Sequence, residues 1–290
     1  MWRAGAYGGA VTTAFVLSGG GSLGSVQAGM VLALAEREIF PDLLVGTSVG
    51  AVNAAWLAGH PGREGADALA DVWRSVRRSD IFPTGFVTGL RGFVGRRDHL
   101  VSSHGLRMLL TRRLTFTCLE DATIPVHVVA SDITTGEEVV LSTGNAVDAV
   151  TASAAIPGVF PPVKIGGRVL VDGAVANNVP IAHAVARGAD HIYVLPTGYA
   201  CAMKEAPRSA LGVALQSLTL MLAQRLAIDV ERYEREVDLV VLPPLCPLAV
   251  SPVDFSHSAE LIDRARDSSG EWLDRPHRSL PHAVLGLHRH

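Results

Sequence analysis

The sequence has few features that would stabilise the fold by anything other than a hydrophobic core, or that would anchor the protein in a membrane. Its 290 residues include only three cysteines, which lie far apart and without C-x-x-C spacing. This pattern excludes a disulfide framework and a cysteine-based zinc site. No apolar run reaches the roughly 18 residues that a membrane-spanning helix needs. Charged residues make up 18% of the chain and hydrophobic residues 48%, which excludes a disordered chain and a coiled coil.

The chain also lacks an excess of positive charge and an acidic ligand loop. Its formal net charge is -3, so there is no global electrostatic reason to expect a nucleic-acid partner. No acidic segment has the ligand spacing of a calcium loop. We therefore predict no metal, no cofactor and no nucleic acid.

Residues 1–11 contain one arginine and many small residues, and we interpret them as a short lead into the first strand rather than a signal peptide. The mean hydropathy of +0.29 is high for a soluble protein. We expect a cytoplasmic protein that can contact a membrane surface peripherally. The sequence gives no indication of the oligomeric state.

The first sixty residues have the rhythm of a parallel α/β sheet. A strand over 12–17 and a glycine-rich turn precede a helix over 25–38, and a second strand over 42–46 precedes a helix over 49–58. Strands or helices are also predicted for the segments 126–131, 138–141, 146–155, 163–165, 168–171, 192–195, 208–236 and 239–242. The fold class is therefore α/β.

Two segments differ from this rhythm. Residues 61–117 are rich in arginine and have no strong strand pattern, so we interpret them as a helical insertion or cap over the sheet. Residues 275–290 are rich in histidine and arginine, and we predict a disordered tail there. The catalytic or binding domain is then expected to span residues 12–274.

A glycine-rich loop, Gly19 to Gly24, follows the first strand and opens the first helix. Glycines let the backbone turn sharply and leave N–H groups free beside a helix N-terminus, where they can bind a phosphate or a developing oxyanion. A dinucleotide site requires an acidic residue at the end of the next strand, where it binds the ribose hydroxyl. Asp42 has roughly the right spacing but precedes that strand, which makes this alternative the weaker one.

The sequence Gly46-Thr47-Ser48-Val49-Gly50 lies between a strand and a helix, which is the context of a nucleophile elbow. Small flanking residues permit a tight turn that exposes the Ser48 hydroxyl. A third motif, Asp172-Gly173, ends a later strand and is well placed to face a site at the sheet edge. In isolation an Asp-Gly pair is typical of a plain turn.

These three motifs, in this order, resemble those of the patatin-like phospholipases. The resemblance extends to the segment ASAAIPGVFPP at 152–162 and to Asn178-Val179-Pro180, and it covers about residues 12 to 200. It implies a three-layer α/β/α fold with a mainly parallel central sheet and a helical cap. It also implies a serine acyl hydrolase that cleaves carboxylic ester bonds of lipids through a serine–aspartate dyad and an acyl-enzyme intermediate.

The resemblance assigns a role to each motif residue. Ser48 would be the nucleophile, Asp172 the base, and Gly19, Gly20 and Gly21 the oxyanion loop. The residues that would support these motifs are Gly24, Gly46, Gly50, Gly173 and Asn178. We expect the N–H groups of Gly20 and Gly21 to be the oxyanion donors, and we expect burial to raise the pKa of Asp172 so that it can serve as a base.

One position departs from the family pattern, because Leu23 stands where many members have a basic residue. This departure makes neutral lipids or simple esters more plausible substrates than anionic phospholipids.

Several other interpretations stay open at this point. A Ser-His-Asp esterase could use His183 or His191, and a lipid-binding or regulatory protein could keep the fold without turnover. Asn177 and Asn178 are expected to fix the loop after Asp172, and the pair Arg96-Arg97 could meet lipid headgroups.

Overall fold

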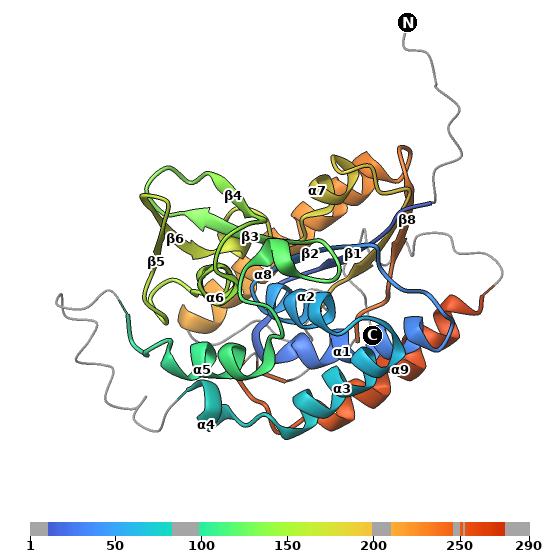
Figure 1. Ribbon diagram of the computed structural model, residues 1–290, viewed down its shortest axis with the longest axis horizontal. Helices are drawn as coiled ribbons and strands as arrows, with labels where there is room; N and C mark the ends of the chain where they lie inside the picture. Colours follow the sequence, from blue (N-terminus) through green and yellow to red (C-terminus); the bar gives the residue numbers. More distant parts are fainter. Residues whose placement is uncertain (1–10, 83–98, 199–209, 246–249, 252, 276–290) are drawn as a thin grey trace, which may run out of the picture.

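The computed structural model describes residues 11–82, 99–198, 210–245, 250–251 and 253–275. Within these residues an eight-stranded sheet has the order β5-β6-β3-β2-β1-β7-β8, with β4 also paired to β3 (Figure 1). Strands β1 (Thr13–Leu17), β2 (Leu43–Thr47), β3 (Val126–Asp132), β7 (His191–Leu195) and β8 (Asp238–Val241) are parallel to one another. Strand β6 (Arg168–Asp172) runs antiparallel to β3 and to β5 (Val163–Ile165), and β4 (Glu138–Leu141) also runs antiparallel to β3.

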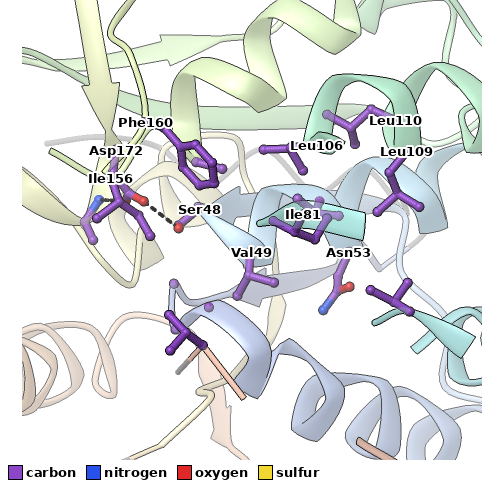
Figure 2. A pocket seen from close by; sticks show the side chains of 18 of the residues that line it. Ser48, Val49, Asn53, Ile81, Leu106, Leu109, Leu110, Ile156, Phe160 and Asp172 are labelled. Atoms are coloured by element: carbon purple, nitrogen blue, oxygen red, sulfur yellow. Dashed lines mark hydrogen bonds between the residues drawn. The ribbon is translucent and has the colours of Figure 1, made fainter. Parts of the chain in front are cut away.

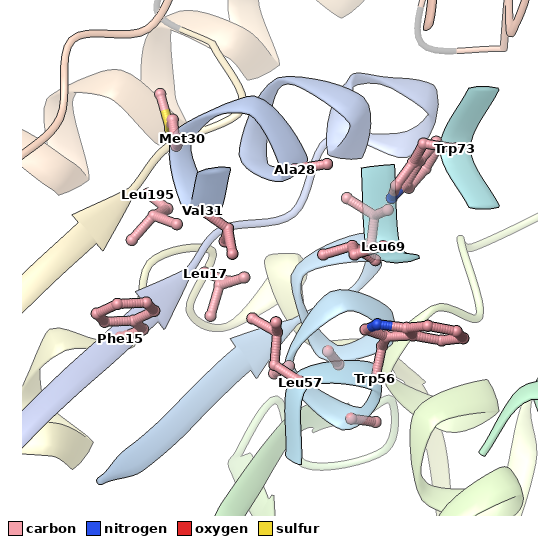
Figure 3. Close-up of a cluster of buried hydrophobic side chains, with 14 of the residues drawn as sticks. Phe15, Leu17, Ala28, Met30, Val31, Trp56, Leu57, Leu69, Trp73 and Leu195 are labelled. Carbon is pink, nitrogen blue, oxygen red and sulfur yellow. The ribbon is translucent and has the colours of Figure 1, made fainter. Parts of the chain in front are cut away.

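Helices cover both faces of the sheet, which gives the predicted three-layer α/β/α fold. Alternate residues of β1 point to opposite faces, as the pleat of a strand requires. Phe15 and Leu17 join the larger core, beneath α1 (Gly24–Ala35), α2 (Val49–Gly59) and α3 (Gly62–Ser75) (Figure 3). Ala14 and Val16 join a second core, which α7 (Ile181–Val185) and α8 (Ala210–Tyr233) complete.

Helix α1 is buried along its whole length. The reason is α9 (Ser258–Leu273), an amphipathic helix that the sequence analysis missed and that covers the side of α1 away from the sheet. The two helices are in close contact, since a Cβ on Gly29 would lie 2.3 Å from the carbonyl oxygen of Ile262. Residue 29 must therefore be glycine for the layers to close.

The predicted insertion contains three helices within the described residues, namely α3, α4 (Arg78–Ile81) and α5 (His104–Arg113). Their apolar side chains, including Leu69, Trp73, Leu106 and Leu110, belong to the same core as α1 and α2. The limits of the insertion and of the domain stay predictions. Arg96-Arg97 and residues 276–290 lie outside the described part of the chain. Helix α6 (Ala146–Ser153) lies beside β3 and brings Ser153 to the site described next.

Candidate active site

Ser48 lies on a sharp turn between β2 and α2. Its backbone angles are φ 56° and ψ -124°, a conformation that costs a residue with a side chain roughly 1–3 kcal/mol. The turn is possible because Gly46 and Gly50 flank it closely: a Cβ on Gly50 would lie 2.2 Å from the Leu17 carbonyl oxygen, and one on Gly46 would lie 2.5 Å from the Gly50 oxygen. The Ser48 N–H donates to the Ser153 hydroxyl at 2.8 Å, which holds the turn in place.

Asp172 reaches Ser48 from the opposite direction along the sheet. Thr47 pairs with Val129 on β3, and Asp172, on the antiparallel strand β6, pairs with the next β3 residue, Ala130. The Ser48 hydroxyl donates to Asp172 Oδ2 at 2.6 Å (Figure 2). The N–H of Ala174 donates to the other carboxyl oxygen at 2.8 Å.

Asp172 is buried, with 4% of its surface exposed. Burial raises its pKa to about 6, while the hydrogen bonds from Ser48 and Ala174 act in the opposite direction. The predicted upward shift of this pKa is confirmed, with desolvation as its cause. Gly173 lets β6 end against β3, because a Cβ there would lie 2.2 Å from the Val129 carbonyl oxygen.

The glycine loop lies beside the same serine. The Gly19 N–H donates to the backbone oxygen of Asn178 at 3.3 Å and to its side-chain oxygen at 3.1 Å. Gly19 is therefore not a free donor, and it links this loop to the loop after Asp172. The N–H groups of Gly20 and Gly21 have no partner among the described residues, and both residues line the cavity in front of Ser48.

A cavity of about 360 Å³ opens at Ser48 and runs between α2, α4 and α5. Figure 2 shows Val49, Ile81, Leu106 and Leu109 around the space beyond the serine. Most of its described wall is apolar, and Asp172 and Arg113 are the charged side chains among the described lining residues. Such a cavity suits an extended apolar group whose polar end stops at Ser48.

The comparisons with known proteins agree with this geometry. The family model described as Patatin-like phospholipase matches residues 15–185, more than half of the 290 residues. The chain belongs to the patatin-like phospholipase family.

The relatives are longer proteins. An uncharacterized NTE family protein of Mycobacterium tuberculosis is 33% identical over 170 residues, which are 57% of this chain and 27% of that protein. Lysophospholipase NTE1 of Lodderomyces elongisporus is 28% identical over 192 residues, 63% of this chain and 12% of that protein. The chain thus spans a minor part of the length of the curated relatives it matches.

Among solved structures, VipD from Legionella pneumophila shares 16% sequence identity and a TM-score of 0.45, over 89% of this chain and 67% of that chain. The fold assignment rests instead on the family model and the sheet topology.

Neither of the histidines considered from the sequence lies at the Ser48–Asp172 pair. His183 Nε2 lies 2.6 Å from Glu138 Oε1, on the opposite layer of the fold from α2. His191, the first residue of β7, lies 2.6 Å from Asp238 at the amino end of the parallel strands. Among the described residues that line the cavity there is no histidine.

Asp42 lies at the opposite end of β1 from the glycine loop. Its carboxylate accepts the Thr13 N–H at 2.8 Å, at the amino end of β1, whereas the loop follows the carboxyl end of that strand. Asp42 is therefore not placed to serve as the acidic residue that a dinucleotide site would need at that edge of the sheet.

The loop after Asp172 is fixed mainly by backbone groups. The Thr47 hydroxyl donates to the Asn177 carbonyl oxygen at 3.0 Å, and the Asn177 N–H donates to Gly173 at 2.8 Å. The side-chain oxygen of Asn177 is buried without a hydrogen-bond partner in the described structure, so it does not fix the loop as we expected. Asn178 does so, through Gly19.

The remaining motif residues serve packing. A Cβ on Gly24 would lie 2.4 Å from Val49 Cγ2, so glycine lets α1 and α2 approach each other. Leu23 is half-buried and packs against the larger core, so this position of the glycine loop carries an uncharged, apolar side chain. The sequence patterns assigned no role to Ser153, although it lies in the segment 152–162 that carries part of the family resemblance. No sequence pattern pointed to Thr197.

Proposed function

We propose that this chain is a lipid acyl-ester hydrolase in which Ser48 and Asp172 form the catalytic dyad. The observation that carries the proposal is the 2.6 Å hydrogen bond from the Ser48 hydroxyl directly to a buried carboxylate, at the mouth of an apolar cavity. Membership of the patatin-like phospholipase family supports it.

In the first half-reaction, Ser48 Oγ attacks the ester carbonyl and its proton passes to Asp172 Oδ2. The carbonyl oxygen becomes an oxyanion that accepts hydrogen bonds from the N–H groups of Gly20 and Gly21, each worth about 3 kcal/mol when preorganised. The tetrahedral intermediate then expels the alcohol, which takes the proton from Asp172, and leaves an acyl-Ser48 ester.

In the second half-reaction, water attacks the acyl-enzyme with Asp172 as base again. The fatty acid leaves and Ser48 regains its proton. A carboxylate with an ordinary pKa is a weak base for a serine hydroxyl, and the raised pKa of Asp172 reduces that mismatch. The strained turn at Ser48 keeps its hydroxyl in the attacking position for the first half-reaction.

The acyl chain would occupy the apolar cavity, with the ester at Ser48. Each buried methylene contributes about 0.8 kcal/mol, which is roughly fourfold in binding. Leu23 gives the loop no cation, and we accordingly propose neutral lipids or simple esters rather than anionic phospholipids as preferred substrates.

Exposed apolar side chains near the cavity mouth suggest how the enzyme would meet its substrate. Val175 and Val253 line the mouth and are 62% and 42% exposed, and Met221, beside the lining residue Leu222, is 68% exposed. We name Val175, Met221, Leu222 and Val253 the mouth rim. We propose that the mouth rim contacts the lipid surface. No helix in the described part of the chain is long and apolar enough to cross a membrane.

Hydrolysis of p-nitrophenyl esters by the wild type, Ser48→Ala and Asp172→Asn tests the dyad. We expect both variants to fold and to lose at least about a thousandfold in kcat, because nucleophile and base act together. A fluorophosphonate should label the wild type at Ser48. Folded wild-type protein that neither turns over esters nor reacts with the probe would instead favour a non-enzymatic lipid-binding protein.

A further inference from the structure

Behind the glycine loop, two buried hydroxyl groups hold one carbonyl oxygen. Thr197, which follows β7, donates its hydroxyl to the Gly19 carbonyl oxygen at 2.6 Å. The Ser18 hydroxyl lies 3.1 Å from the same oxygen and accepts the Thr197 N–H at 2.9 Å. Both side chains are buried, and neither is among the residues that line the cavity.

The position of the Gly19 oxygen determines where the next N–H group points. In a trans peptide the C=O of one residue and the N–H of the next lie in one plane and point in opposite directions. Fixing the Gly19 oxygen toward Thr197 therefore turns the Gly20 N–H away from Thr197. That N–H has no partner among the described residues, and Gly20 lines the cavity beside Ser48.

This peptide needs an anchor because it joins two glycines. Without side chains, rotation about the bonds on either side of a peptide meets little steric resistance, so the plane can turn over at low cost. Thr197 also occupies the space beside Gly20, where a Cβ would lie 2.1 Å from its hydroxyl oxygen. The hydroxyl thus restricts the peptide both by a hydrogen bond and by contact.

The base of the loop is also fixed from below. Gln27, fully buried, donates its amide to the carbonyl oxygens of Ser18 and Leu195, both at 2.9 Å. This amide ties the end of β1 to the end of β7, so Ser18 and Thr197 keep their relative positions. The motion that remains is rotation of the Gly19–Gly20 peptide plane, and the hydroxyl groups of Thr197 and Ser18 restrict it.

We propose that Thr197, assisted by Ser18, is a positioning residue that holds the Gly20 N–H toward the oxyanion formed at Ser48. This inference rests on the proposed hydrolase function. Neither residue touches the substrate. Their effect on the reaction is the orientation of one hydrogen-bond donor before the transition state forms.

Thr197→Val removes the hydroxyl while keeping the shape of the side chain, and Thr197→Ser keeps the hydroxyl. Thr151→Val is the matched control, because Thr151 is also buried and its hydroxyl donates to Val147 within its own helix. Each variant is assayed on a p-nitrophenyl ester, with the concentration of active sites determined by fluorophosphonate titration.

Loss of a whole oxyanion donor lowers kcat by about 100- to 1000-fold, and a donor that is only misoriented part of the time loses less. We expect Thr197→Val to lower kcat per active site by about 10- to 100-fold, with KM changed by less than about threefold and with the same apparent pKa of activity. Thr197→Ser should stay within about threefold of the wild type, as should the Thr151→Val control.

Equal turnover per active site in Thr197→Val and the wild type would overturn the proposal, as would an equal loss in Thr197→Ser. If Thr197→Val does not fold, Ser18→Ala provides the decision: a lower kcat with unchanged KM supports the positioning role, and unchanged kcat contradicts it. Failure of the hydrolase function would be recognised separately, since Ser48→Ala would then be as active as the wild type.

Discussion

Replacing Asp172 by Asn should make the protein more stable while it abolishes activity. Asparagine has nearly the same shape, and its side-chain oxygen can still accept the Ala174 N–H. Its amide can donate to the Ser48 hydroxyl, which lies 2.6 Å from the present carboxylate. The substitution therefore removes the buried charge and little else.

The magnitude follows from the pKa of Asp172. A rise from the ordinary value of 3.8 to about 6 corresponds to about 3 kcal/mol at 1.36 kcal/mol for each pKa unit. Because the folded state binds this proton more tightly than the unfolded state, stability falls as pH rises from about 4 to about 6 and stays lowered above that. Asp172→Asn escapes this loss, so above pH 7 it should be more stable by up to about 3 kcal/mol.

Denaturant unfolding of both proteins at pH 4, 5, 6 and 7.5 checks the prediction. The stability difference should be largest at pH 7.5 and shrink toward zero at pH 4. Asp132→Asn is a control of opposite sign, because hydrogen bonds from Thr134 lower the pKa of Asp132. That variant should be less stable than the wild type at neutral pH. An Asp172→Asn variant without a pH-dependent gain would refute the idea that the site retains an unfavourable buried charge.

Four further outcomes are expected. With a base of pKa about 6, kcat/KM should rise through pH 6 and fall about tenfold between pH 7 and pH 5; a flat profile over this range would contradict Asp172 as the base. Ser153→Ala leaves the buried Ser48 N–H without its acceptor, so unfolding measurements should show a loss of about 1–3 kcal/mol, and turnover per active site should fall. Leu109→Trp narrows the cavity and should lower the ratio of kcat/KM for long-chain to short-chain p-nitrophenyl esters; an unchanged ratio would place the acyl chain elsewhere. Met221→Asp should reduce hydrolysis of neutral lipid vesicles but not of soluble short-chain esters, and equal loss on both would argue against the mouth rim as the lipid contact.

The elements nearest the site could be predicted because their signals are local. The strand before Gly19, the strand before Ser48 and the helices after them follow from apolar pattern and turn residues within a few positions. The helix α9 could not be predicted in the same way. Its apolar stripe is evident only as the cover for α1, and α1 itself has no polar side that would reveal how deeply it is buried.

The sequence by itself determined the kinds of group at the site: a serine between small residues, an aspartate at a strand end, and consecutive glycines before a helix. Each depends on backbone conformation, which neighbouring residues restrict. Only the tertiary structure decided which groups meet. Ser48 and Asp172 are 124 residues apart, and they touch because β2 and β6 flank β3, and β6, which runs antiparallel to β3, ends at the edge of the sheet where β2 ends. The same strand order brings Thr197 under the glycine loop and keeps His183 and His191 away from Ser48, because a contact between distant segments depends on strand order and direction, which no short stretch of sequence encodes.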